Sequence, residues 1–207
     1  MRPVRIVSGR AVPLDRSDVD TDQIIPSDWL KRVERTGFGA GLFSEWRDDR
    51  EFVLNRPEHA GAKILVAGSN FGVGSSREHA VWALMDYGFE AVVSPRFGDI
   101  FHTNCTKQGL VPVRVEPELG RRLLDAITAD PSLELTIDVE RGSVEAPSAG
   151  LEGAFPLDGF TRERLLNGWD DIGLTLRHEN EIRSYEVTRP RWMPVANPGA
   201  RGAAVQA

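Results

Sequence analysis

Two hydroxyl groups and a guanidinium stand next to one another in the sequence, at Ser75, Ser76 and Arg77. An apolar run over 64–67 predicts a buried strand, and a glycine-rich turn over 68–74 joins this strand to the three side chains. A strand, a glycine-rich turn and a helix start direct backbone N–H groups and a positive dipole end at an anion. Since arginine suits bidentate binding of carboxylates, the pattern predicts a pocket for a carboxylate-bearing ligand.

The spacing of the glycines disfavours three common uses of such a turn. No lysine follows the last glycine as a phosphate-binding loop requires, and neither G-x-G-x-x-G nor G-x-S-x-G occurs here. A structural alternative stays open, because Ser75 or Ser76 can cap a helix predicted over 76–87. Ser75 and Glu78 also have capping-box spacing. Arg77 favours the anion pocket, since a cation in the first helical turn is unfavourable unless an anion lies nearby.

Four aspartates fall within eight residues, from Asp15 to Asp22. Their spacing resembles the start of a calcium-binding EF-hand loop. Gln23, however, stands where such a loop needs glycine, and Trp29 stands where it needs glutamate. The simpler interpretation is a turn in which aspartate side chains bind local backbone N–H groups. A specific role for Asp22 is the alternative.

Neither the histidines nor the cysteine predicts a metal site. His102 and Cys105 lie three residues apart on one predicted helix face, but no second pair completes a zinc site. His59 is expected at the surface, and His79 can face either solvent or the core. Because Cys105 is the only cysteine, this chain cannot supply the several thiolate ligands of an iron–sulfur cluster.

Composition narrows the functional classes. Of 207 residues, 41% are apolar and 27% are charged, as in an ordinary globular protein. The formal charge of −6 argues against nucleic acid as a partner. No apolar run approaches the roughly 18 residues of a membrane span, and the N-terminus lacks the apolar stretch of a secretory signal. We therefore expect a cytoplasmic protein without membrane partners.

The predicted elements place the glycine-rich turn inside an α/β fold. Strands alternate with helices in a central β-α-β-α-β block, which implies a parallel sheet with right-handed crossovers. The block comprises strands 64–67, 91–94 and 111–115 with helices 76–87 and 97–107 between them. Pro112 favours an edge position, or the end of the strand, for the last strand.

Further segments surround this block. The patterns predict a strand at 5–12, a helix at 118–128, a β-hairpin between Leu133 and Glu145, and C-terminal helices over 159–167, 170–176 and 178–187. We expect one domain over 1–189 and a disordered tail over 190–207. Alternating glycines at 37, 39 and 41 indicate that residues 27–47 form a mobile loop that shapes substrate specificity.

Several segments together resemble the small subunits of 3-isopropylmalate dehydratase, a family within the aconitase superfamily. The resemblance covers residues 3–190. It rests on DTDQIIP at 20–26, GFG at 37–39, LFSEWR at 42–47, GSSREHA at 74–80, RFGDIF at 96–101 and DIGLTL at 171–176.

This resemblance implies an aconitase-type swivelling β/β/α domain that acts with a large subunit. The large subunit would carry a [4Fe–4S] cluster, while this chain would bind no cofactor or metal. Together they would form a hydro-lyase of leucine biosynthesis. It would interconvert the small dicarboxylates 2-isopropylmalate and 3-isopropylmalate through 2-isopropylmaleate.

The resemblance also implies roles for individual residues. Ser75 corresponds to the catalytic base of the family, and Asp22 corresponds to an active-site aspartate. Ser76 and Arg77 correspond to groups that bind the carboxylates of the substrate.

The sequence departs from aconitase-type enzymes after Trp29. Those enzymes carry a substrate-binding arginine shortly after this point, in an F-R-G segment that is missing here. Leu30 would suit an isopropyl group, and Lys31 is the other candidate for binding substrate in this segment.

Three other functions stay open. The same machinery could act on citramalate or on homocitrate-like acids, because loop residues decide among these substrates. The chain could instead be a nucleotide- or anion-binding regulatory module, although the phosphate-loop lysine is missing. It could also be a structural partner whose serines only cap a helix.

Overall fold

The computed structural model describes residues 1–31, 36–190 and 192–193. The chain divides into two compact units, Met1–Asp170 and Asp171–Ala207. No helix in these described stretches is long and apolar enough to cross a membrane. The first unit contains all of the sheet and is described first.

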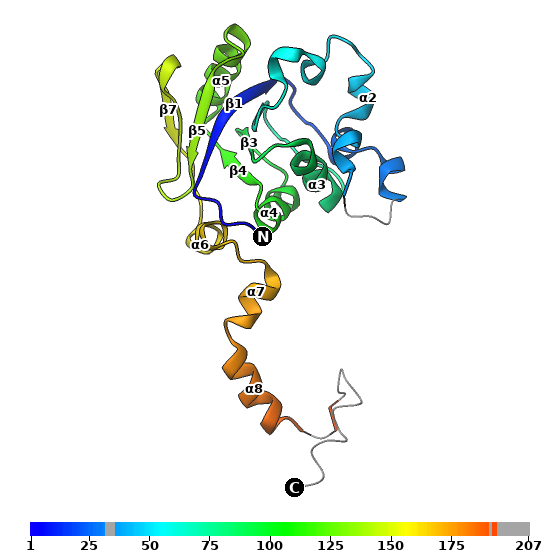
Figure 1. The fold of residues 1–207 in the computed structure, drawn as a ribbon, viewed down its shortest axis with the longest axis vertical. Coiled ribbons are helices and arrows are strands. Elements are labelled where there is room, and N and C mark those ends of the chain that lie inside the picture. The colour runs from blue at the N-terminus through cyan, green and yellow to red at the C-terminus, as the bar shows by residue number, and fades with distance from the viewer. Residues whose placement is uncertain (32–35, 191, 194–207) are drawn as a thin grey trace. The chain divides into compact units, whose positions relative to one another are not determined.

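A single mixed sheet forms the centre of the first unit (Figure 1). Its strand order is β4-β3-β2-β1-β5-β6-β7. Strands β1 to β4 pair in parallel, β5 to β7 pair antiparallel, and β1 joins the two halves. The strands span Ile6–Leu14 (β1), Ile64–Ala67 (β2), Ala91–Ser94 (β3), Val111–Arg114 (β4), Glu134–Asp138 (β5), Ser143–Ala146 (β6) and Leu151–Ala154 (β7).

The predicted α/β class and its parallel block are confirmed. Helices α3 (Glu78–Tyr87) and α4 (Asp99–Gln108) form the crossovers between β2, β3 and β4. They cover one face of the sheet, and α5 (Pro117–Ala129) covers the other (Figure 1). Pro112 lies in β4, the edge strand, where a residue without an N–H group interrupts no ladder on the open side.

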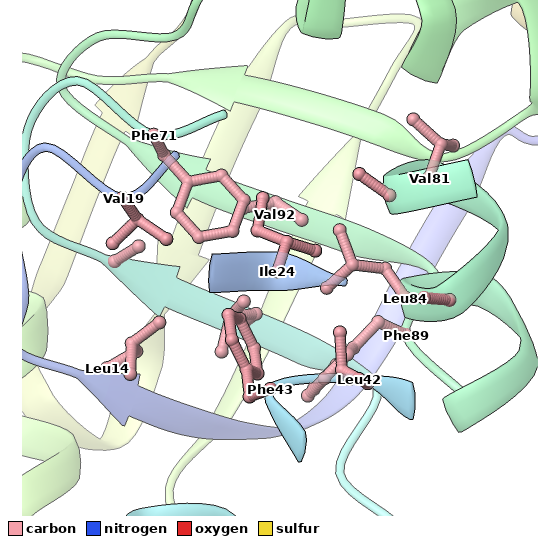
Figure 2. Close-up of a cluster of buried hydrophobic side chains, with 14 of the residues drawn as sticks. Leu14, Val19, Ile24, Leu42, Phe43, Phe71, Val81, Leu84, Phe89 and Val92 are labelled. Atoms are coloured by element: carbon pink, nitrogen blue, oxygen red, sulfur yellow. The ribbon is translucent and has the colours of Figure 1, made fainter. Parts of the chain in front are cut away.

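Residues of β2 and β3 are buried throughout because helices cover both faces of the parallel half. Successive side chains of β2 point to opposite faces, so Leu65 and Ala67 enter one apolar cluster while Ile64 and Val66 enter the other. Figure 2 shows part of the first cluster. It gathers aromatic and aliphatic side chains from β1, α1, α3 and the loops between them.

The antiparallel half contains the predicted hairpin and one strand more. Gly142 turns the chain between β5 and β6 with a φ of 69°, and its N–H donates to the carbonyl of Asp138 at 2.8 Å. A 3₁₀ turn, η5 (Pro147–Ala149), then leads into β7, which the sequence analysis missed. Only Leu151 is buried in β7, and the sequence Leu151–Ala154 contains no apolar run that would predict a strand. Helix α6 (Gly159–Asn167) follows, and the Asp158 side chain caps it by accepting from the Thr161 N–H at 3.0 Å.

Short elements fill the long connection between β1 and β2. They are α1 (Thr21–Ile24), η1 (Ser27–Lys31), η2 (Phe38–Gly41), α2 (Ser44–Arg47), η3 (Val53–Asn55) and η4 (Pro57–His59).

The segment predicted as a loop, 27–47, folds tightly in its second part. Phe38, Leu42 and Phe43 are fully buried in the first apolar cluster. A Cβ atom on Gly41 would lie 2.5 Å from the ring of Trp29, which explains why glycine stands there. Residues 32–35 lie outside the described residues, and the mobility of the loop stays a prediction.

The second unit contains helices α7 (Asp171–Leu176) and α8 (Glu179–Thr188), close to the predicted ranges. No residue of either helix is buried. The tail predicted at 190–207 lies almost entirely outside the described residues. The single domain expected over 1–189 likewise stays a prediction.

Candidate active site

The carboxyl ends of β1, β2 and β3 meet at one edge of the sheet, where α/β proteins bind their ligands. Backbone bridges join the loops that follow these strands, pairing Asp20 with Val73 and Phe71 with Phe97. The buried hydroxyl of Ser94 at the end of β3 donates to the carbonyl of Gly68 at 2.7 Å. These contacts between loops far apart in the sequence hold the glycine-rich turn in place.

Two glycines allow the loops to approach each other closely. Gly72 has a φ of 75° and lies against the ring of Phe101. A Cβ atom on Gly98 would lie 2.4 Å from the carbonyl oxygen of Gly72. Side chains at these two positions would therefore push the turn after β2 away from the start of α4.

A pocket of about 250 Å³ opens at this edge. Ser75, Arg77 and Thr21 line it together with the turn 72–74 and the first residues of α4 at 98–101. The predicted base and the predicted carboxylate-binding arginine thus face the same cavity.

The backbone of Ser75 is fixed by Thr21, a residue to which the sequence analysis gave no role. The buried Thr21 hydroxyl donates to the Ser75 carbonyl at 2.9 Å, and the Thr21 N–H donates to the Val73 carbonyl at 2.9 Å. Ser75 itself remains exposed. Thr21 belongs to the segment 20–26 that carries the family resemblance, but the resemblance implied a role only for Asp22 there.

The capping interpretation of the serines is wrong. Helix α3 begins at Glu78, two residues later than predicted, and Arg77 occupies the N-cap position with an extended backbone and no side-chain cap. The side chain of Glu78 accepts a hydrogen bond from Gln108 of α4 at 2.5 Å instead of completing a capping box. Neither Ser75 nor Ser76 therefore serves as the predicted cap.

Arg77 and Asp22 form an ion pair between the turn after β2 and helix α1. The Arg77 side chain is 18% exposed and that of Asp22 is 53% exposed. A carboxylate from solution can reach this guanidinium from the pocket that Arg77 lines. The pair brings together two residues that are 55 positions apart in the sequence.

The aspartates before α1 have separate partners, so the interpretation as a single local turn holds only for Asp20. Asp20 caps α1 in a capping box with Gln23. Asp18 accepts from Asn70 at 2.7 Å, and both residues adopt left-handed backbone with φ of 55° and 65°. Asp15 instead pairs with Arg121 of α5 at 2.9 Å.

Three predicted substrate-binding residues do not line this pocket. Leu30 packs against the first apolar cluster. Lys31 forms an exposed ion pair with Asp28 at 2.9 Å, and Ser76 is exposed beside the pocket. Their roles in binding substrate stay predictions.

Comparisons with known proteins identify the family. The family model of the aconitase C-terminal domain matches residues 1–118, and the model of the C-terminal domain of 3-isopropylmalate dehydratase small subunits matches residues 171–195. A 3-isopropylmalate dehydratase small subunit from Rubrobacter xylanophilus is 60% identical over 94% of this chain and 98% of its own length. The chain belongs to the 3-isopropylmalate dehydratase small-subunit family.

Two further relatives agree. The 3-isopropylmalate dehydratase small subunit of Frankia alni is 61% identical over 95% of this chain and all of its own length. A crystal structure of 3-isopropylmalate dehydratase from Methanocaldococcus jannaschii superimposes with a TM-score of 0.65 at 27% identity. The alignment covers 87% of this chain and 99% of the other. The aconitase-type fold that the sequence predicted is therefore confirmed.

The residues of this member of the family do not fit an iron–sulfur cluster. Its one cysteine, Cys105, is fully buried in α4, and burial raises the pKa of the thiol well above its usual value. Among the described residues, no group of three histidine, cysteine or acidic side chains is placed to hold a metal ion.

No histidine is among the described residues that line the Ser75 pocket of this 3-isopropylmalate dehydratase family member. His59 is buried at 5% exposure, so the expectation of a surface residue is wrong. Desolvation, followed by the nearby arginines, lowers its pKa, although Glu58 and Ala11 oppose the shift. His79 packs against Phe38 and Trp82.

Proposed function

We propose that this chain is the small subunit of a 3-isopropylmalate dehydratase, a hydro-lyase that acts only with a large subunit. The reaction would interconvert 2-isopropylmalate and 3-isopropylmalate through 2-isopropylmaleate, as a step of leucine biosynthesis in the cytoplasm. Identity of about 60% over nearly the whole length of curated small subunits carries this proposal. The Ser75 pocket, with its exposed serine beside an arginine, is the feature of the chain that suits the chemistry.

Ser75, as its alkoxide, would take the proton from one carbon of the substrate and become a neutral hydroxyl. The hydroxyl group of the neighbouring carbon would leave as hydroxide, which needs an electrophile supplied by the large subunit. A serine hydroxyl is a weak base, so its alkoxide needs stabilisation. Arg77 lines the same pocket, and helix α3, with its positive dipole end, begins at Glu78, three residues after Ser75. The bond between Thr21 and the Ser75 carbonyl would limit movement of this serine during the reaction.

Arg77 would bind a carboxylate of the substrate by exchanging partners. Asp22 pairs with this guanidinium. An arriving carboxylate can replace Asp22 or share the fork of N–H donors with it. Asp22 would keep the arginine oriented between turnovers, and Ser76 would bind the same carboxylate from the adjacent position.

Residues 27–47 would set the preference for the isopropyl side chain. Leu30 is half-buried against the first apolar cluster and lies next to Lys31, so this segment offers an apolar group beside a cation. Leu30→Ala should therefore reduce discrimination between isopropyl- and methyl-substituted malates. Equal turnover of 2-isopropylmalate and citramalate by the unaltered enzyme would point to the wider substrate range instead.

The cluster would belong to the large subunit, because this chain has a single buried cysteine. A [4Fe–4S] cluster there would supply a Lewis acid for the hydroxyl group that leaves. The small subunit would provide the base, the arginine and the walls of the pocket. Neither chain alone would then be active.

Ser75→Ala tests the proposal most directly. In the complex reconstituted with the large subunit, kcat for 2-isopropylmalate should fall by about 10²- to 10⁴-fold because the base is lost. Ser143→Ala, on the hairpin far along the sheet, is the matched control and should leave kcat unchanged. Near-normal activity of an assembled Ser75→Ala complex would contradict the assignment of the base. No activity of the unaltered complex on 2-isopropylmalate would contradict the function.

A further inference from the structure

A second hollow, of about 300 Å³, lies beside the Ser75 pocket. Its charged and polar walls are Arg96, Asp99, His102, Thr103 and Arg114, and Phe97 supplies an apolar surface. Asp99 also lines the Ser75 pocket, so the two cavities are neighbours. Arg77 lines only the Ser75 pocket, whereas Arg96 and Arg114 line only the second hollow.

The fold itself brings the two arginines of this hollow together. Arg114 ends β4 and pairs in register with Ser94, the last residue of β3. Arg96 follows Ser94 by two residues, and the Ser94 hydroxyl oxygen holds this turn by accepting from the Arg96 N–H at 3.4 Å. Two cationic side chains thus converge at the carboxyl ends of two neighbouring parallel strands, where this class of sheet binds ligands.

These guanidinium groups are unpaired within the described residues. Arg96 and Arg114 are both exposed, and neither side chain forms an ion pair or hydrogen bond there, although the chain carries an excess of acidic residues. Like charges that line one hollow repel each other. Asp99 offsets part of this charge, but it lies in the first turn of α4, where the helix dipole already stabilises it.

We propose that this hollow binds a small oxyanion, a carboxylate or phosphate group held between Arg96 and Arg114. A volume of about 300 Å³ suits a ligand of metabolite size. The Thr103 hydroxyl already donates to the Asp99 carbonyl at 3.0 Å, so the two arginines would provide most of the binding. Phe97 would contact the apolar part of the ligand. The inference concerns residues outside the Ser75 pocket and stands whether or not the proposed reaction is correct.

Titration of the full-length chain with inorganic phosphate and with citrate, followed by calorimetry, tests the site. Saturable binding is expected. Arg96→Gln and Arg114→Gln should each weaken it by about tenfold or more, because each removes a charge-assisted contact. Arg122→Gln is the matched control, since Arg122 is an exposed arginine of α5 on the other face of the sheet. It should leave the affinity unchanged.

His102 provides a second, local measurement. Its pKa is lowered by desolvation and then by Arg114, while Asp158 and Asp99 oppose the shift. An anion bound at Arg114 offsets the positive charge of that guanidinium, so the pKa of His102 should rise when phosphate saturates the chain. NMR titration of the histidine ring signals would follow the change, and the buried His59 serves as the internal reference.

The outcomes separate the possible ligands and can overturn the site. Tighter binding of phosphate than of citrate would indicate a phosphate-bearing ligand, and the reverse order would indicate a polycarboxylate. Either result, combined with the loss in the Arg96 and Arg114 variants, supports the proposal. The absence of saturable binding, an equal loss in Arg122→Gln, or an unchanged His102 at saturation would overturn it. Thermal unfolding of each variant verifies that the fold is intact.

Discussion

The two halves of the sheet share β1 but differ in what their strand ends can build. Strands β1 to β4 are parallel, so the chain must cross over between each of them and the next, and all their carboxyl ends meet at one edge. Strands β5 to β7 are antiparallel and return through short turns such as the one at Gly142. Ser75, Arg77 and the second hollow all lie in the parallel half.

The parallel half therefore carries the candidate site, whereas the antiparallel half contributes to the apolar core. Crossover connections leave room for loops that carry polar side chains, and the parallel edge gathers these loops around one place. The antiparallel half instead closes the second apolar cluster with side chains such as Leu135, Ile137 and Val144. We therefore expect substitutions in the antiparallel half to change stability and substitutions at the parallel edge to change catalysis.

Leu135→Ala should produce the largest loss of stability. Leu135 is fully buried in β5, so removing its side chain leaves a cavity that costs about 2–5 kcal/mol of unfolding free energy. The kcat/KM of the folded complex should stay unchanged, because the described residues that line the Ser75 pocket include none from β5. Urea unfolding and steady-state kinetics on the same preparation measure both. A large fall in kcat/KM of Leu135→Ala with little loss of stability would contradict the proposed separation between a stabilising and a catalytic half of the sheet.

Arg77→Gln should show the reverse pattern. Loss of a charge-assisted contact to the substrate carboxylate should lower kcat/KM by about 10- to 100-fold, with stability nearly unchanged. The control is Arg141→Gln in the hairpin. Arg141 lies 3.8 Å from Asp138 and is 77% exposed, so its loss should alter neither quantity. Equal kinetics for the two variants would remove the role given to Arg77.

Gly98→Ala should lower both the stability and kcat/KM, because Gly98 lies where the loops that form the site contact each other. Its new methyl group would lie 2.4 Å from the Gly72 carbonyl, so the loops after β2 and β3 must separate, at a cost of about 1–3 kcal/mol. Gly159→Ala at the start of α6 meets nothing within 4 Å and should stabilise by up to about 1 kcal/mol. Calorimetric melting of the two variants tests whether their changes in stability have opposite signs. An unchanged stability of Gly98→Ala would contradict the close contact.

The smallest expected effect concerns pH. The pKa values of His59 and His102 are both lowered from 6.5, chiefly by desolvation, so the unfolded chain binds more protons than the folded one at mildly acidic pH. This stability is complete above pH 6.5 and is lost as the pH falls toward the folded-state pKa values. The β5–β7 strands contain no histidine.

A series of urea unfolding curves between pH 5 and pH 8 would measure this slope. His102→Gln should flatten it in part, since one of the two depressed histidines is removed. His178→Gln, at an exposed position in the second unit, should leave the slope unchanged. A slope that His102→Gln does not alter would show that other groups dominate the acid sensitivity.

Local patterns predicted the elements that depend on local causes. The apolar run at 64–67 and the alternation of strands and helices both appear in the structure as predicted. Strand β7 was missed because its sequence, Leu151–Ala154, gains its conformation from pairing with β6 rather than from its own apolar pattern.

The sequence predicted only some of the residues that line the candidate site, and none of the contacts that hold them: Ser75 and Arg77 line the pocket, whereas Ser76, Leu30 and Lys31 do not. The types and order of Ser75, Ser76 and Arg77 pointed to a carboxylate pocket. The predicted capping of α3 by a serine was wrong, because Arg77 is the N-cap residue and Ser75 lies before the helix, where its carbonyl accepts from Thr21. Bonds across 54 and 55 sequence positions, from Thr21 to Ser75 and from Asp22 to Arg77, leave no trace in local spacing. The burial of His59 was missed for the same reason.

The single cysteine has a practical consequence. Cys105 of α4 is fully buried, and burial raises the pKa of its thiol, so that the thiol stays protonated and unreactive at neutral pH. A maleimide dye or spin label added to the native protein should therefore leave it untouched. A cysteine introduced at any exposed position, such as Ile100 on the rim of the Ser75 pocket, becomes the sole attachment point. Fluorescence or electron-resonance measurements on the chain with a large subunit therefore need no prior removal of a native thiol.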